Sequence, residues 1–129
     1  MTSVTLDTDR LALMDLFTDA ERQEIAEAMI ESVEELLTRL PAAIESGDLE
    51  DAAEVAHMGL NEAAVVGAVE LRDAFRELER ACRSAELMLA REIRERVELL
   101  WPPTRLAVED LGHRDAADRQ RQSGAEPIG

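Results

Sequence analysis

The longest amphipathic stretch of the chain spans residues 18–44 and reads TDAERQEIAEAMIESVEELLTRLPAAI. Its apolar residues recur every three or four positions, which places them on one face of a helix. They are Ile25, Met29, Val33, Leu36, Leu40 and Ile44. Thr18 and Glu21 have the spacing of a capping box, so we expect the helix to begin there. Pro41 falls near its end, where we expect it to bend the helix rather than end it.

Turn residues divide the rest of the chain into further helical segments. Gly47 suits the left-handed position after a helix, and Asp48 suits the cap of a third helix over residues 49–66. The inward face of this third helix is mostly small, which allows neighbouring helices to approach closely. A fourth and a fifth helix follow, and Pro102 and Pro103 are expected to end the fifth. The inward residues of these three helices are Ala53, Ala56, Leu60, Ala63 and Val66, then Leu71, Phe75, Leu78 and Cys82, then Leu87, Ala90, Ile93, Val97 and Leu100.

Four long helices joined by very short connections are expected to be antiparallel neighbours. The sequence therefore predicts an all-α fold, an antiparallel up-down-up-down four-helix bundle over residues 9–103. A short apolar segment at residues 11–17 is expected to form an N-terminal helix that covers the bundle as a lid. Residues 104–129 are rich in Asp, Arg, Gln and Gly, and we interpret them as a largely disordered tail.

The charge of the chain is strongly acidic. Its 129 residues carry 29 acidic against 14 basic side chains, a net charge of −15, and every basic one is an arginine. Such a chain is repelled by phosphate backbones and anionic lipids, so we expect neither a nucleic-acid nor a membrane partner. No apolar run approaches the ~18 residues of a membrane span. The single cysteine, Cys82, excludes an intrachain disulfide and lies on an apolar face, which indicates a structural thiol. We expect a cytoplasmic monomer.

Few residues of this sequence offer chemistry. Glu54 and His57 have the Glu-x-x-His spacing of metal sites in helical bundles, which usually need two such pairs. The only other histidine, His113, lies in the expected tail, so we predict no metal site and no cofactor. No Gly-rich phosphate loop, nucleophile elbow or Ser/His/Asp pattern is found. His57 itself falls at the margin of the bundle, exposed on one side.

The segment 44–57 reads IESGDLEDAAEVAH and resembles the approach to the phosphoacceptor of histidine-containing phosphotransfer (HPt) domains. In that family a long amphipathic helix ends in a Gly-Asp turn, and the next helix carries Ala-His, as Ala56 and His57 do here. The resemblance covers residues 11–101 and implies the same bundle. Further residues at family positions are Ala63, Gly67, Ala68, Leu71, Leu78 and Glu79.

The resemblance implies that His57 is the phosphoacceptor of a phosphorelay. His57 would take a phosphoryl group from the aspartyl phosphate of a receiver domain and pass it to another receiver. The partner would be the receiver domain of a response regulator or of a hybrid histidine kinase. That receiver would supply the catalytic magnesium ion and lysine, so that this chain is a phosphocarrier and no enzyme. The expected docking surface consists of Met58, Gly59, Leu60, Asn61, Ala64 and Val65.

The chain departs from the family pattern directly after the histidine. The family has Leu-Lys-Gly at the second, third and fourth following positions, and this chain has Gly59, Leu60 and Asn61. Leu60 supplies no positive charge for a phosphoryl group, although Asn61 can donate an amide hydrogen bond. The missing cation is expected from Arg72 or Arg76 of the next helix.

These departures leave an alternative open, a degenerate HPt-like binding module that docks a receiver domain or a histidine kinase without phosphoryl transfer. A third possibility is an unrelated helical adaptor or dimerisation bundle. The surroundings of His57 distinguish the first two. An open imidazole with an arginine within reach favours transfer, whereas a histidine covered by Leu60 or paired to Glu54 favours binding alone.

Overall fold

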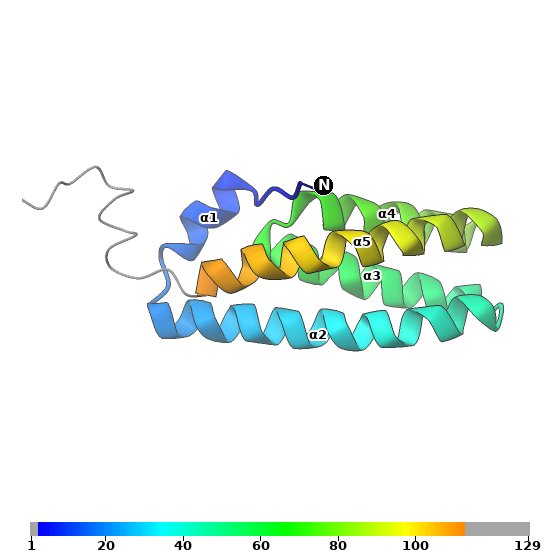
Figure 1. The fold of residues 1–129 in the computed structure, drawn as a ribbon, viewed down its shortest axis with the longest axis horizontal. Coiled ribbons are helices and arrows are strands. Elements are labelled where there is room, and N and C mark those ends of the chain that lie inside the picture. Colours follow the sequence, from blue (N-terminus) through cyan, green and yellow to red (C-terminus); the bar gives the residue numbers. More distant parts are fainter. Residues whose placement is uncertain (1–2, 113–129) are drawn as a thin grey trace, which may run out of the picture.

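The computed structural model describes residues 3–112, which contain five helices (Figure 1). The short α1 (Thr8–Met14) precedes the long helices α2 (Asp19–Glu45), α3 (Leu49–Val66), α4 (Val69–Arg83) and α5 (Leu87–Gly112). Each long helix packs on two others, because α2 and α4 both contact α3 and α5. Since the connections are short, this arrangement is an antiparallel four-helix bundle. The predicted all-α fold class is confirmed.

α2 begins at the residues that the sequence predicts. The Thr18 backbone N–H donates to Glu21 Oε1 over 2.9 Å, and the Glu21 N–H donates to Thr18 Oγ1 over 3.1 Å, which completes the capping box. Both hydrogen bonds with Thr18 lower the pKa of the Glu21 carboxyl. The helix continues through Pro41, because Leu40 and Ile44 on either side of it are buried in the core.

Glycines close the turns at both ends of α3. Gly47 has φ +80° and Gly67 has φ +70°, a left-handed conformation that glycine adopts without steric cost. Asp48 then caps α3 by accepting the N–H of Asp51 over 3.1 Å. The turn at Gly67 also holds the N-terminal segment, because the Asp7 N–H donates to the Gly67 carbonyl over 2.7 Å. This contact places the start of α1 beside the end of α3.

α5 does not end at Pro102 and Pro103 but continues to Gly112, contrary to the prediction. The prolines remove two N–H donors, yet the row of buried residues along α5 continues beyond them with Thr104, Val108 and Leu111. Tertiary packing therefore overrides the local preference of proline. The predicted boundary at residue 103 is wrong, since residues 104–112 belong to the bundle. The rest of the expected tail, residues 113–129, lies outside the described residues.

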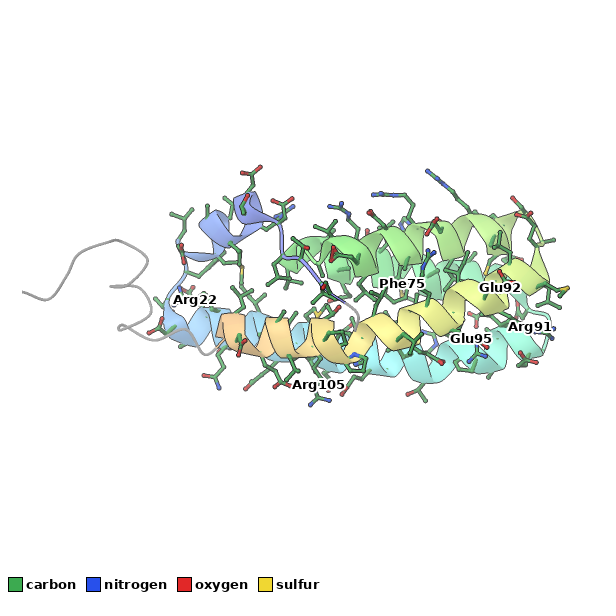
Figure 2. The ribbon with its side chains drawn as sticks, turned by 45° about the horizontal axis from the view of Figure 1, so that its top comes forward. Arg22, Phe75, Arg91, Glu92, Glu95 and Arg105 are labelled. Atoms are coloured by element: carbon green, nitrogen blue, oxygen red, sulfur yellow. The ribbon has the colours of Figure 1, made fainter. Side chains whose placement is uncertain are left out.

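A buried arginine holds the connection between α1 and α2 (Figure 2). Only 1% of Arg22 is exposed, and its Nη1 donates to the carbonyl oxygens of Phe17 over 2.7 Å and of Met14 over 3.4 Å. The guanidinium thus binds the carbonyl of the last residue of α1 and the carbonyl of Phe17 in the turn before α2. The short N-terminal helix is present as expected, but it spans Thr8–Met14 rather than residues 11–17.

Candidate functional site

His57 lies near the middle of α3 and faces α4. Its imidazole is 53% exposed, and Nδ1 lies 3.1 Å from Oε1 of Glu79 in α4. The Gly67 turn makes the two helices antiparallel, which brings positions 57 and 79 to the same level. The structure therefore places His57 at the exposed margin of the bundle, where the helical repeat puts it.

α3 and α4 approach each other closely beside His57. A Cβ atom on Gly59 would lie 2.6 Å from the ring of Phe75, which real Cβ atoms essentially never do. Phe75 is labelled in Figure 2. Gly59 is buried, so it offers no exposed surface, and its place in the expected docking surface is corrected. The absence of a side chain at this position lets the helices lie close enough for His57 and Glu79 to meet.

Glu79 joins His57 to an arginine. Its side chain is 17% exposed, and while Oε1 faces His57, Oε2 accepts from Arg83 Nε over 2.9 Å and lies 2.8 Å from Arg83 Nη2. Burial of Glu79 opposes its ionisation, but the hydrogen bonds from Arg83 and His57 outweigh burial and lower the pKa of the Glu79 carboxyl. The site is therefore a chain of three polar side chains built around an ionised carboxylate.

This carboxylate selects one tautomer of the histidine. An ionised carboxylate only accepts hydrogen bonds, so the contact with Glu79 requires a proton on Nδ1 of His57. In a neutral imidazole the lone pair then lies on Nε2. The site thus offers the lone pair of Nε2 on a side chain that is 53% exposed.

The other expected site residues differ in exposure. Met58 and Val65 are exposed to 39% and 49%, and Asn61 is exposed as well. Ala64 is half-buried, and Leu60 packs partly against the core. Leu60 therefore leaves the imidazole open.

The positive charge near His57 comes from an arginine that the sequence analysis does not single out. Arg72 and Arg76 both pair with Asp73, over 3.4 Å and 3.3 Å. Arg83 instead shares the carboxylate of Glu79 with His57. The signal for Arg83 in the sequence is its spacing of four residues from Glu79, which is typical of an ion pair along a helix.

Three residues around the end of α1 extend the apolar surface beyond α3. Leu13, Leu16 and Phe17 are exposed to 47%, 81% and 41%. With Val65 of α3 they help to line an apolar hollow of about 280 Å³. Val65 follows His57 by eight residues, a distance of about 12 Å along a helix. The sequence pattern of residues 11–17 predicts only a lid, and their apolar character is the signal in the sequence for this surface.

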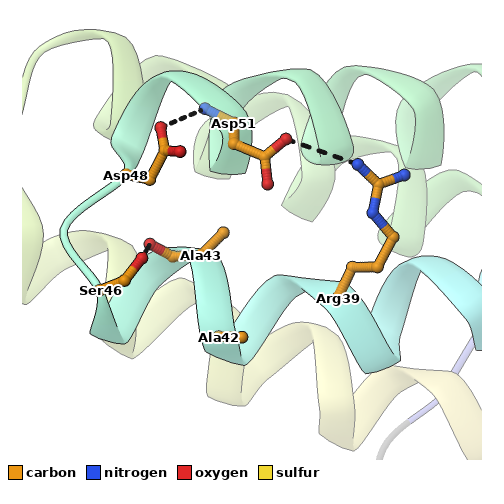
Figure 3. Close-up of a pocket in the computed structure, with 6 residues that line it drawn as sticks. All are labelled: Arg39, Ala42, Ala43, Ser46, Asp48 and Asp51. Atoms are coloured by element: carbon orange, nitrogen blue, oxygen red, sulfur yellow. Dashed lines mark hydrogen bonds and ion pairs between the residues drawn. The ribbon is translucent and has the colours of Figure 1, made fainter.

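Another hollow, of about 410 Å³, lies at the turn between α2 and α3 (Figure 3). Its polar groups already serve the fold, because Asp48 caps α3 and Asp51 pairs with Arg39 over 3.4 Å. Within residues 3–112, no three His, Cys, Asp or Glu side chains are placed to hold a metal ion together. In the same range no helix combines the length and the apolar character needed to cross a membrane. The surroundings of His57 therefore remain the candidate site.

Comparison with known proteins assigns the family. The family model of the Hpt domain matches residues 24–112, more than two thirds of the chain, and its match ends at the same residue as α5. Neither a curated protein nor a solved structure matches the chain. Hpt domains are helical bundles that act as phosphotransfer modules of two-component signalling, as phosphocarriers rather than catalysts, and they interact with receiver domains and histidine kinases. The resemblance found in the sequence is thus confirmed, and the chain belongs to the Hpt domain family.

Proposed function

We propose that His57 accepts a phosphoryl group on Nε2 from the aspartyl phosphate of a receiver domain and passes it to the aspartate of another receiver. The observation that carries this proposal is the exposed imidazole whose Nδ1 is held by Glu79 at 3.1 Å. That hydrogen bond fixes the orientation of the ring and keeps the lone pair on Nε2.

The transfer needs no general base from this chain, because Nε2 of the neutral imidazole carries a lone pair and no proton. The Nε2 lone pair of His57 attacks phosphorus, the bond from phosphorus to the receiver's carboxylate oxygen breaks, and the aspartate leaves with the electron pair. The ring then carries the phosphoryl group on Nε2 and the original proton on Nδ1. The positive charge that develops on the ring faces the carboxylate of Glu79. Transfer to the second receiver reverses these steps.

The exposed apolar residues support docking of a receiver domain beside His57. Met58 directly follows the histidine, and Val65 lies two turns further along α3, where it lines the apolar hollow with Leu13, Leu16 and Phe17. Exposed apolar patches of this kind mark interaction sites. Phosphotransfer requires a partner that leaves after each transfer, so we expect a small interface with a Kd of about 1 μM.

Leu60 and Asn61 support a second candidate function, an Hpt-like module that binds a receiver or kinase without phosphoryl transfer. Neither residue supplies the positive charge that the family lysine places beside the phosphoryl group. Glu54, exposed on the preceding turn of α3, adds a negative charge on the same side. Phosphoryl transfer remains the first proposal, because the imidazole is open and pairs with Glu79 rather than Glu54.

Incubation with a phosphorylated, receiver-containing kinase from the same genome tests the proposal. The wild type should acquire an acid-labile, base-stable label, and His57→Gln should acquire none. Leu60→Lys with Asn61→Gly restores the family residues and should raise the labelled fraction. No label on the wild type, with label appearing only after this restoration, would establish the binding module instead.

A further inference from the structure

Arg83 is the arginine that shares a carboxylate with His57. It binds Oε2 of Glu79 while His57 faces Oε1 of the same carboxylate. We propose that Arg83 binds the phosphoryl group on His57 and takes the place of the positive charge that Leu60 lacks. This inference rests on the proposed phosphotransfer function and assigns a phosphoryl-binding residue to it.

The register of the two helices directs Arg83 toward the imidazole. Side chains on a helix lean toward its N-terminus, so His57 leans over the turn of α3 that contains Ala53. Arg83 lies beside that turn, because it lines a hollow of about 340 Å³ together with Ala53 and Glu50. Arg83 in turn leans along α4 toward Glu79. Since α3 and α4 are antiparallel, the two side chains converge.

The guanidinium keeps donors for a further ligand. Arg83 uses Nε and one Nη2 hydrogen on Glu79, which leaves three of its five N–H groups. Its side chain is 55% exposed, and because the guanidinium is planar, the Nη1 donors lie on the edge that faces away from Glu79. Ala53, which lines the same hollow as Arg83 one turn before His57, carries only a methyl group.

The negative charges around His57 favour a cation beside a phosphoryl group. A phosphoryl group on Nε2 would lie near the carboxylates of Glu79 and Glu54, and Glu50 borders the adjoining hollow. These carboxylates repel the negative charge of a phosphoryl group, whereas a guanidinium offers it both a positive charge and paired hydrogen bonds.

Other arginines of α4 are directed elsewhere. Arg72 and Arg76 both pair with Asp73, which lies on the N-terminal side of Glu79 in α4, whereas Arg83 lies on the C-terminal side. Arg80 lines a hollow with Ile93 and Arg96 and therefore faces α5. Arg80→Gln is thus a matched control, because it removes the same charge from the same helix on another face.

The test uses the full chain and phosphoramidate as the phosphoryl donor. The donor's P–N bond breaks and releases ammonia as the P–Nε2 bond forms on His57, so no partner protein is needed. The lifetime of the phosphohistidine is measured after the donor is removed. Arg83→Gln should shorten that lifetime about three- to fivefold, as expected for loss of an exposed charge pair. Arg80→Gln should leave it unchanged, and Arg83→Lys, which keeps the charge, should fall between.

A second variant separates phosphoryl binding from a structural role. Leu60→Lys in the Arg83→Gln background places a cation on the other side of His57 and should restore most of the lifetime. Equal lifetimes for Arg83→Gln and Arg80→Gln, or no restoration by Leu60→Lys, would overturn the role of Arg83 and leave the proposed function intact. No phosphoryl group on the wild type, from phosphoramidate or from a phosphorylated receiver, would overturn both.

Discussion

Within residues 3–112, the four long helices form four seams, each between two neighbouring helices. An arginine and a carboxylate bridge three of these seams at the surface, whereas a histidine bridges the seam between α3 and α4. The histidine bridge is His57 to Glu79. The arginine bridges are Arg39–Asp51 between α2 and α3, Arg96–Glu77 between α4 and α5, and Arg91–Glu45 and Arg105–Glu34 between α2 and α5. Arg91 and Arg105 are labelled in Figure 2.

The difference between these seams is chemical rather than architectural. A guanidinium is always protonated and has no lone pair to offer a phosphorus atom, whereas an imidazole held at Nδ1 offers one on Nε2. Exposed ion pairs contribute only ~0–1 kcal/mol to stability, so an arginine bridge can be exchanged for a histidine at little cost. The bundle therefore tolerates a histidine at its rim, because the buried core carries the stability.

The largest effect is expected from a truncation that removes part of the packing between α2 and α5. A chain that ends after Pro103 loses the buried Val108 and Leu111. Removal of large buried aliphatic groups costs about 2–5 kcal/mol each, so the truncated chain should lose its cooperative thermal transition in circular dichroism. A chain that ends after Gly112 keeps every described helix and should retain the transition. Equal transitions for the two truncations would show that the last turns of α5 do not belong to the core.

That experiment also marks where sequence analysis of the fold succeeds and fails. The start of α2, the caps around Gly47 and the bounds of α3 follow from signals within a few residues, and the structure agrees with them. The end of α5 depends instead on packing against α2, where a Cβ on Gly112 would lie 3.1 Å from Ala26 Cβ. A local rule about proline cannot weigh a contact with a helix more than 80 residues away in the chain.

A smaller effect is expected where α3 and α4 approach each other. Gly59→Leu should destabilise the protein by about 1–3 kcal/mol in chemical denaturation, because its side chain would overlap the ring of Phe75. Phe75→Leu should also destabilise, by opening a cavity. The double variant should cost less than the sum of the two, since the smaller side chain makes room for the added one. Additive costs would mean that positions 59 and 75 do not share one space.

The same contact explains what the sequence could predict of the site. His57 follows from helical spacing and family resemblance, and its exposure agrees with both. The burial of Gly59 depends on the ring of Phe75, and the position of Arg83 depends on the register of two antiparallel helices. Both are tertiary facts that one helical pattern does not contain.

The smallest expected effect concerns the histidine bridge and its pH dependence. The pKa of Glu79 is lower in the folded protein than its ordinary value, so its ionised form stabilises the fold. This stabilisation is present above the ordinary glutamate pKa of about 4.3 and is lost as the pH falls through the folded value. Glu79→Gln should therefore be less stable than the wild type at pH 7, by less than about 1 kcal/mol, because both partners of Glu79, His57 and Arg83, are half exposed.

Thermal denaturation of both proteins between pH 7 and pH 3 measures this difference. The gap in Tm should close toward acid, because the wild-type carboxylate becomes protonated and releases Arg83 and His57 while the glutamine is unchanged. Glu54→Gln is the matched control, since Glu54 is an exposed glutamate of α3 and His57 pairs with Glu79 instead. A gap that stays constant across this range would show that the charge of Glu79 does not support the fold. In that case the hydrogen bond to Glu79 would still orient His57. The histidine bridge would then contribute nothing to the free energy of unfolding, whereas the arginine bridges contribute a small amount.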